Sequence, residues 1–240
     1  IVIIVATLLG ALVIIGGYKI YNNIKVSKEK KRAKQERLEK LKPQEFTVKG
    51  VSFTMIAVEN GTFQMGATME QNSREYDEIP VHDVTLSDYY IGETEVTQEL
   101  WSAIMNGDNP SKFKGGNKPV EQVSWNDCRD FITKLNQLTG KKFRLPTEAE
   151  WEFAARGGNK SDKFKYSGGN IIDDVAWYSG NSKSETHDVK TKSPNELQIY
   201  DMSGNVWEWC ADWFGKDYYQ TSPDVDPQGP ASGPFRVLRG

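Results

Sequence analysis

A stretch of fourteen residues, Tyr200–Trp213, constrains the fold of this chain more than any other part of it. It contains three of the seven tryptophans, and these are interleaved with the carboxylates Asp201, Glu208 and Asp212. Tryptophan side chains favour the protein interior, whereas carboxylates are rarely buried unless a partner neutralises them. The stretch therefore needs a compensating cation, an arginine or a set of backbone N–H donors.

Charge is divided unevenly along the 240 residues of the chain. Residues 1–42 carry ten Lys or Arg against three Glu, whereas residues 43–240 carry 20 basic and 30 acidic side chains, a net charge of −10. Binding to nucleic acid requires basic side chains that displace counterions, so we expect no nucleic-acid partner for the acidic part. An acidic domain is instead a suitable host for a hard cation.

The N-terminal stretch predicts a transmembrane anchor over residues 1–20. Ile1–Gly17 contains no charged side chain, and as a helix it is about 25 Å long, slightly less than the thickness of a bilayer core. The alternative is a signal-peptide core, but no small-residue cleavage site follows. Membrane lipid is therefore an expected partner, and we expect a single-pass membrane protein. The Lys-rich stretch after this segment favours a cytoplasmic position for the domain, because Lys and Arg next to a membrane segment stay on the cytoplasmic side. This positive-inside rule compares both flanks of the segment, and the sequence contains one of them.

Residues 21–45 are predicted to form a basic, charged helical stalk. In its later part the only regularly spaced apolar residues are Leu38 and Leu41, so the stretch lacks the seam of a coiled coil and is typical of a solvated helix. Pro43 ends the helix. The globular domain is expected to cover residues 46–240.

The first part of this domain predicts short strands. Alternating apolar residues predict strands over 48–58, and Asn60-Gly61 predicts a hairpin turn to a return strand over 62–66. A further strand is predicted over Val81–Tyr90, where apolar and polar residues alternate again.

Three helices are predicted from their capping residues. Thr97 caps the start of a helix predicted over 98–105. Ser124 caps the start of a second helix and Gly140 ends it. Thr147, with Glu150 as its capping-box partner, begins a third helix over 148–155. A short strand, Phe143–Leu145, is predicted before the third helix. The chain after Gly158 is rich in turn residues, and a long irregular stretch of this kind is uncommon unless something specific holds it in place.

Six short motifs follow one another along the domain. They are Gly61–Gly66, Glu93–Thr97, Val120–Trp125, Arg144–Glu152, Gly204–Trp209 and Arg236–Gly240. In this order they resemble the sulfatase-modifying-factor family, also called formylglycine-generating-enzyme-like. The resemblance implies an irregular α+β fold, related to C-type lectins, with little regular secondary structure and with calcium as a structural cofactor.

The same resemblance implies that the Trp-rich segment holds one Ca²⁺. Asp201 and Glu208 supply side-chain oxygens in this reading, and Gly204 and Val206 supply backbone carbonyls. Ca²⁺ prefers six to eight oxygen ligands, so the chemistry of this donor set suits it. The alternative role for the two carboxylates is to cap and hydrogen-bond a turn.

A second calcium site of the family lies upstream, where Asn181 and the Ser182 carbonyl match and the remaining ligands have no counterpart that can be assigned. The chain also departs from the family at Gln198, where glycine is common; glutamine is unfavourable there if the backbone needs a positive φ. Asp212 is a candidate partner for an arginine. The arginines considered for this role are Arg144, Arg156 and Arg239.

Catalytic members of the family oxidise a sulfatase cysteine to formylglycine, with oxygen and a copper ion held by two cysteines. Those cysteines follow the motif in which this chain stops at Gly240, so copper is expected only if further sequence supplies them. Cys128 and Cys210 do not match those positions, have no metal-ligand spacing, and are either a pair or two buried thiols. His82 and His187 are too few for a three-histidine metal site.

Two functions follow from these observations. The first is a membrane-anchored formylglycine-generating-enzyme-like domain, which is an oxidoreductase in its catalytic relatives. The second is a non-catalytic, calcium-stabilised module that binds a protein, peptide or glycan, or that assembles a bacterial-type membrane or surface complex. Because one fold can serve both roles, the sequence leaves open whether the chain is an enzyme.

Overall fold

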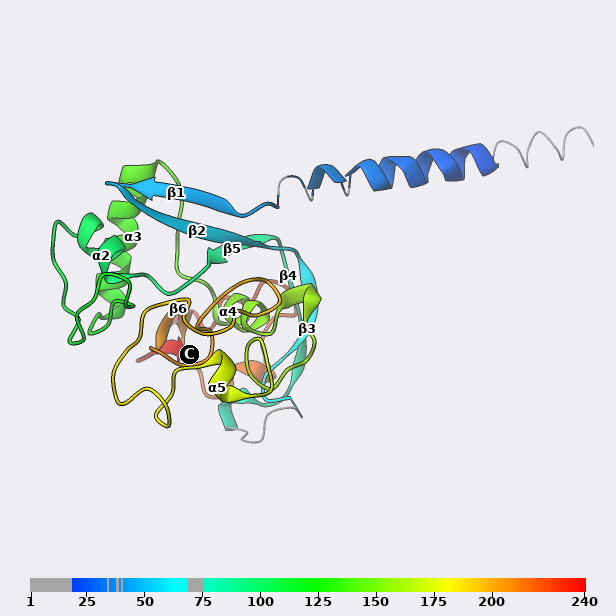
Figure 1. The fold of residues 1–240 in the computed structure, drawn as a ribbon. Coiled ribbons are helices and arrows are strands. Elements are labelled where there is room, and N and C mark those ends of the chain that lie inside the picture. Colours follow the sequence, from blue (N-terminus) through cyan, green and yellow to red (C-terminus); the bar gives the residue numbers. More distant parts are fainter. Residues whose placement is uncertain (1–18, 34, 38, 40, 69–75) are drawn as a thin grey trace, which may run out of the picture. The chain divides into compact units, whose positions relative to one another are not determined.

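The computed structural model describes residues 19–33, 35–37, 39, 41–68 and 76–240, and the chain divides into two units, Ile1–Lys42 and Pro43–Gly240. Residues 19–33 form a helix in the first unit (Figure 1). The predicted anchor over residues 1–20 lies almost entirely outside the described residues. Within the described part of the chain, no helix is both long enough and apolar enough to cross a bilayer.

The second unit opens with a three-stranded antiparallel sheet. It consists of β1 (Gln44–Val48), β2 (Val51–Val58) and β5 (Tyr89–Gly92), in the order β1-β2-β5 (Figure 1). Lys49 and Gly50 join β1 to β2, with φ values of 49° and 85°. Positive φ at both residues is what a type I′ hairpin turn requires. The region predicted as strand over 48–58 is therefore broken by this turn.

The hairpin predicted at Asn60-Gly61 is wrong. β3 (Gly61–Met65) pairs with β4 (His82–Leu86) in a separate two-stranded sheet, whereas β2 pairs with β1 and β5. A two-residue hairpin turn of the predicted type needs positive φ at both positions, and neither Asn60 nor Gly61 has it. The Asn60 N–H instead donates to Asp88 Oδ1 at 2.7 Å, where the chain crosses from one sheet to the other.

The strand predicted over Val81–Tyr90 is in fact two strands, β4 and β5, which belong to different sheets. Ser87 lies between them and donates hydrogen bonds from its N–H and its hydroxyl to the carboxylate of Asp226, at 2.8 and 2.7 Å. Asp226 is far away in the sequence, so alternation within the stretch could not reveal this break.

The three predicted helices and their caps are confirmed. They are α2 (Gln98–Ile104), α3 (Trp125–Thr139) and α4 (Glu148–Ala155). Ser124 with Asp127, and Thr147 with Glu150, form reciprocal capping boxes at the starts of α3 and α4. Each box satisfies backbone N–H groups that have no partner inside the helix.

The remainder of the domain has little regular structure, as the turn-rich sequence predicts. Its short elements are the 3-10 turns η1 (Tyr76–Glu78), η2 (Gly158–Lys160) and η3 (Tyr218–Gln220), the helix α5 (Ile172–Val175), and the strands β6 (Glu208–Trp213) and β7 (Arg236–Arg239). β6 and β7 pair antiparallel and were not predicted. The strand predicted for Phe143–Leu145 is absent; Asn136 instead bonds both the N–H and the carbonyl of Phe143, at 2.6 and 3.0 Å.

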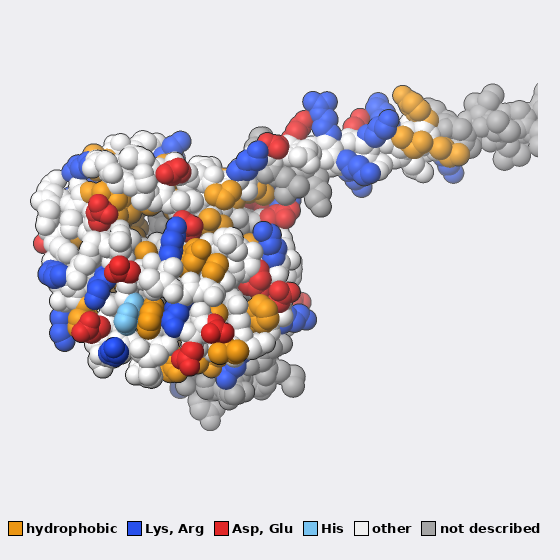
Figure 2. Space-filling view, in the orientation of Figure 1, with side chains coloured by type: hydrophobic (Ala, Val, Ile, Leu, Met, Phe, Trp, Pro, Cys, Tyr) orange, Lys and Arg blue, Asp and Glu red, His pale blue; other side chains and the backbone are white. Residues whose placement is uncertain are grey.

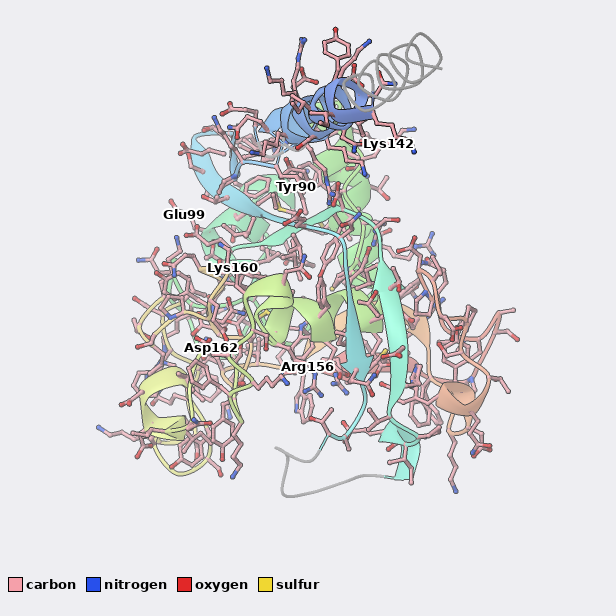
Figure 3. The ribbon with its side chains drawn as sticks, turned by 90° about the vertical axis from the view of Figure 1, so that its right-hand side faces the viewer. Tyr90, Glu99, Lys142, Arg156, Lys160 and Asp162 are labelled. Carbon is pink, nitrogen blue, oxygen red and sulfur yellow. The ribbon has the colours of Figure 1, made fainter. Side chains whose placement is uncertain are left out.

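Two hydrophobic clusters form the core of the domain. The larger one is centred on α4, whose Trp151, Phe153 and Ala154 pack against side chains of β2 to β6. The smaller one joins α2 and α3 to the β1–β2 hairpin and includes Trp101 and Phe131, whose rings stack with centroids 5.0 Å apart. In Figure 3, α4 lies behind the long strands and Arg156 marks its C-terminal end. The helix therefore connects most of the irregular segments to one core.

Candidate metal centre

The Trp-rich segment starts as a tight loop and continues as β6. Asp201, Gly204 and Asn205 have positive φ values of 60°, 96° and 63°. Position 204 requires glycine, because a Cβ there would lie 2.2 Å from the carbonyl oxygen of Trp177. The Asn205 N–H donates to that same carbonyl at 2.8 Å. The loop is thus packed tightly against Trp177, and Asp201 is only 4% exposed.

Glu95 is the residue that sequence reasoning missed. It lies between β5 and α2 and is buried, and its two carboxylate oxygens accept hydrogen bonds from Asn205 Nδ2 at 2.9 Å and from the Val206 N–H at 3.2 Å. Burial raises the pKa of Glu95 well above its ordinary value, and the charges of Glu208 and Asp201 raise it further. The motif Glu93–Thr97 drew attention to the segment but gave no reason to place Glu95 beside the loop.

Asp201, which is buried, and Glu208, which is half-buried, form a group with Glu95 that we call the carboxylate cluster. Burial raises the pKa of Glu208 to about 7; the Trp151 side chain opposes this rise, and the charge of Asp201 adds to it. Burial also raises the pKa of Asp201, although the Lys190 N–H donates to it at 2.9 Å. Among the described residues, no Lys or Arg side chain forms an ion pair with any of the three carboxylates.

The chemistry of the carboxylate cluster suits a hard cation. All of its donor atoms are oxygens, and the carbonyls of Gly204 and Val206 lie in the same loop, which is the kind of ligand set that Ca²⁺ prefers. The described residues contain no group of three or more His, Cys, Asp or Glu side chains already placed to hold a metal ion. Asp201 raises the pKa of both Glu95 and Glu208, and Glu208 raises that of Glu95, although the three carboxylates do not converge on one point.

Asn181 and Ser182, the residues matched to a second calcium, use their oxygens in hydrogen bonds within the protein. Asn181 Oδ1 accepts from the Tyr178 N–H at 2.9 Å, and the Ser182 carbonyl lies 2.9 Å from His187 Nε2. A cationic side chain is also close, because Lys192 bonds the Asp173 carbonyl and Asn181 donates to the carboxylate of the same Asp173. The structure does not join these residues to the carboxylate cluster.

Arg144, Arg156 and Arg239 pair with glutamates of α4 rather than with Asp212. Arg144 contacts Glu150 at 2.6 Å, whereas Arg156 and Arg239 both contact Glu152, each at 2.9 Å. Asp212 instead accepts from the Glu148 N–H at the start of α4, at 2.9 Å. A carboxylate is favoured at a helix N-terminus, where backbone N–H groups lack partners. Burial still raises the pKa of Asp212 to about 6.

The two cysteines are free thiols. Cys210 is fully buried in β6, and burial raises its pKa well above the ordinary value. Burial also raises the pKa of Cys128 to about 11. Both side chains therefore stay protonated at neutral pH, and within the described part of the chain neither belongs to a group of three or more His, Cys, Asp or Glu side chains placed to hold a metal ion.

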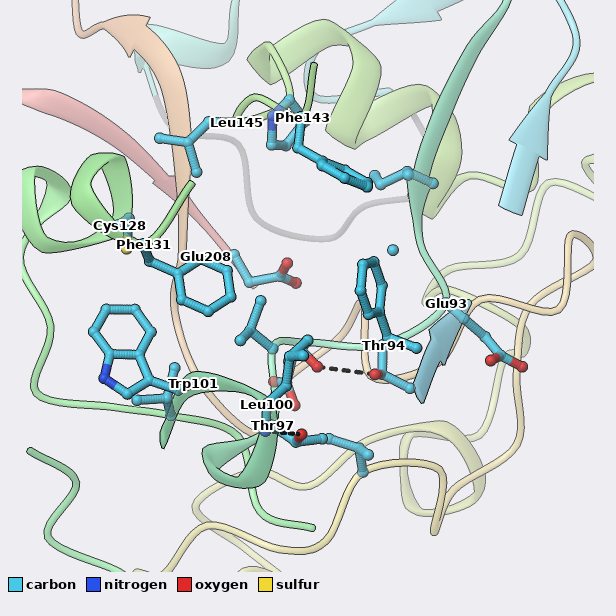
Figure 4. A pocket seen from close by; sticks show the side chains of 18 of the residues that line it. Glu93, Thr94, Thr97, Leu100, Trp101, Cys128, Phe131, Phe143, Leu145 and Glu208 are labelled. Atoms are coloured by element: carbon cyan, nitrogen blue, oxygen red, sulfur yellow. Dashed lines mark hydrogen bonds between the residues drawn. The ribbon is translucent and has the colours of Figure 1, made fainter. Parts of the chain in front are cut away.

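Cys128 lines a cavity of about 430 Å³ between the α2–α3 pair and β6. Figure 4 shows that apolar side chains such as Leu100, Phe131 and Phe143 surround it, and that the carboxylate of Glu208 points into it. The carboxylate cluster thus has an apolar cavity on one side. The apolar lining offers the Glu208 carboxylate few polar partners on that side, in agreement with its raised pKa.

The sulfatase-modifying factor enzyme 1-like (FGE-sulfatase) domain matches residues 40–240 of the chain. A chaperone protein LppX of Paenibacillus barcinonensis is 37% identical over an alignment of 213 residues that covers 68% of this chain and 72% of the relative. A formylglycine-generating enzyme of Streptomyces coelicolor is 43% identical over 137 residues, which are 52% of this chain but only 41% of the enzyme.

Among solved structures, the Treponema denticola variable protein 1 superposes with a TM-score of 0.73 at 38% identity, over 82% of this chain and 86% of that one. The resemblance drawn from the six motifs is confirmed by these matches, and so is the mixed α/β fold that it implied. The chain belongs to the FGE-sulfatase family.

Proposed function

We propose that residues 46–240 form a calcium-stabilised binding scaffold of the FGE-sulfatase family. One observation carries the proposal: Glu95 and Asp201 are buried, Glu208 is half-buried beside them, and no described cationic side chain pairs with the three carboxylates. Burying carboxylates without compensation is unfavourable, and a divalent cation bound among them removes that cost. In this proposal Asp201 and Glu208 bind Ca²⁺ through side chains, Gly204 and Val206 through carbonyls, and Glu95 supplies the third carboxylate.

Bound Ca²⁺ would act on the fold rather than on a substrate. The cluster joins the segment before α2 to the Trp-rich loop and, through Asn205, to the loop that contains His187. A cation at this point holds three irregular segments that have few regular backbone hydrogen bonds of their own. Asn181 and Ser182 remain the candidate ligands of a second, upstream calcium.

Melting experiments test the proposal. The melting temperature of the full chain is expected to fall in EDTA and to recover with Ca²⁺, because a ligand bound only by the folded state adds about 2.7 kcal/mol when its concentration is 100 times the Kd. Asp201→Ala and Glu208→Ala should each abolish the response. Asp108→Ala, which removes an exposed carboxylate elsewhere in the domain, is the matched control. A melting curve that is the same in EDTA and in Ca²⁺ would contradict the proposal.

A second candidate function is formylglycine generation, and the 43% identity to the Streptomyces coelicolor enzyme favours it. In such enzymes two thiolates hold copper, and the burial of Cys128 and Cys210 keeps both protonated here. The reaction is therefore not assigned to these two cysteines. The full chain, supplied with copper and oxygen, can be incubated with a cysteine peptide from a sulfatase and examined by mass spectrometry. Conversion of cysteine to the aldehyde would favour the enzyme, and an unchanged peptide would favour the scaffold.

A further inference from the structure

We propose that the helix of residues 19–33 binds the surface of a membrane that contains anionic phospholipid. The first observation is a group of apolar side chains at the start of the helix. Ile20, Tyr21 and Ile24 are 61%, 64% and 51% exposed, and their i, i+1, i+4 spacing places them on one side of the helix. Residues 1–18 contain no charged side chain, so apolar character increases toward the beginning of the chain. Such a surface is unfavourable in water and favourable at the boundary of headgroups and acyl chains.

The second observation is the charge that follows these apolar side chains. Residues 19–33 contain six basic side chains and one acidic side chain, Glu29. All six are exposed, and those drawn in Figure 2 project from the helix in several directions. The basic residues are Lys19, Lys25, Lys28, Lys30, Lys31 and Arg32. Lys and Arg next to an apolar membrane-seeking segment are attracted by the negative potential of an anionic lipid surface.

A third observation gives the headgroup a place on the helix. Asn23, Val26, Ser27, Lys30 and Lys31 line an open hollow, and their i, i+3, i+4, i+7, i+8 spacing puts them on one face. The hollow offers an amide, a hydroxyl and two ammonium groups, all of which donate hydrogen bonds to phosphate oxygens.

The ammonium groups are available for this role. In the described part of the chain, Lys25, Lys28, Lys30 and Lys31 form no ion pair with a carboxylate, whereas Arg32 is engaged with Glu36 at 2.7 Å. Other polyanions fit less well. A nucleic acid would leave Ile20, Tyr21 and Ile24 in water, whereas a lipid surface covers them. The apolar side chains and the charge together favour a lipid surface.

Vesicle flotation of the full chain tests the proposal. Binding is compared between vesicles of phosphatidylcholine alone and vesicles that also contain phosphatidylglycerol, with EDTA present so that Ca²⁺ cannot bridge protein and lipid. The wild-type chain is expected to bind the anionic vesicles at least about tenfold more tightly, with a preference that shrinks as salt is raised. Replacing Lys25, Lys28, Lys30 and Lys31 with Gln should remove the preference and leave any binding to neutral vesicles unchanged.

The matched control replaces four exposed lysines of the domain, Lys141, Lys142, Lys183 and Lys216, with Gln. It changes the net charge by the same amount and should keep the preference for anionic vesicles. Equal binding of the wild-type chain to both vesicles would overturn the proposal. So would loss of the preference in the control, since overall charge would then be the cause. Sedimentation without vesicles completes the test. If the wild-type chain self-associates and the variant with Gln at positions 25, 28, 30 and 31 does not, another copy of the chain is the partner instead.

Discussion

The side-chain amide of Asn205 donates a hydrogen bond to Glu95, with Nδ2 and Oε2 2.9 Å apart. The same amide also donates to the His187 carbonyl at 3.1 Å, and its oxygen accepts from the His187 N–H at 2.9 Å. One asparagine therefore joins three segments that are distant in sequence. Because Glu95 lies in the carboxylate cluster, a change in the charge of that cluster alters a hydrogen bond of the asparagine that holds all three segments together.

Glu95→Gln separates a calcium role from a purely structural one. In EDTA the variant is expected to melt close to the wild type at pH 8, because removal of a buried carboxylate offsets the loss of the acceptor for the Val206 N–H, while the amide oxygen can still accept from Asn205. In Ca²⁺ its affinity should be about tenfold lower, a loss of about 1.4 kcal/mol. Calcium titrations followed by melting temperature measure both effects. A titration equal to that of the wild type would remove Glu95 from the site.

Gln198→Gly is expected to stabilise the domain. Gln198 has a φ of 67°, a left-handed conformation that costs a non-glycine residue about 1–2 kcal/mol. Glycine removes that strain but loses about 0.5–1 kcal/mol in backbone entropy, so a net gain of about 0.5–1 kcal/mol is expected. Urea denaturation measures it. Gln44→Gly, in the extended backbone of β1, is the control and should destabilise the domain.

Stability should fall as pH rises toward neutrality. Burial raises the pKa of Glu148 to about 7; Arg239 opposes the rise, and Glu152 and Asp212 add to it. The folded state therefore keeps a proton that the unfolded state releases. The contribution is present in full below about pH 4.5, the ordinary pKa of the group, and is lost as pH rises through about 7.

Glu148→Gln tests this pH dependence. In EDTA the variant should be more stable than the wild type at pH 8, by about 1–3 kcal/mol, and should differ little at pH 4.5. The free energy of unfolding across this pH range is the measurement. Glu45→Gln, at an exposed position of β1, should leave the slope unchanged. A variant with the same pH dependence as the wild type would assign the slope to other groups.

Thiol titration checks the state of the cysteines. The unfolded chain should yield two reactive thiols, because Cys128 and Cys210 are free. In the native protein at pH 8 both should react slowly, since Cys210 has no exposed surface and the pKa of Cys128 is about 11. Absence of thiols in the unfolded, unreduced chain would show that the two residues form a disulfide.

Local features were predicted well from the sequence. The cap Ser124 and the capping box of Thr147 with Glu150 were predicted correctly, because a cap and its partner are close in sequence and their chemistry is independent of the rest of the fold. Gln198 was also recognised as unfavourable if its φ is positive, which it is. The Asn60-Gly61 hairpin failed because Asp88, from a distant segment, decides where Asn60 directs the chain.

Among the residues of the candidate site, the sequence by itself pointed to Asp201 and Glu208, which remain predicted ligands, and to the tight glycine turn between them, since these lie within one short motif. It also determined the family, because six motifs in a fixed order are a property of the chain alone. Only the tertiary structure decided that Glu95 lies beside this loop, that Asp212 meets the start of α4, and that Arg239 pairs with Glu152. These contacts join residues dozens of positions apart, and burial, which sets their charges and their pKa values, exists only once the core has formed.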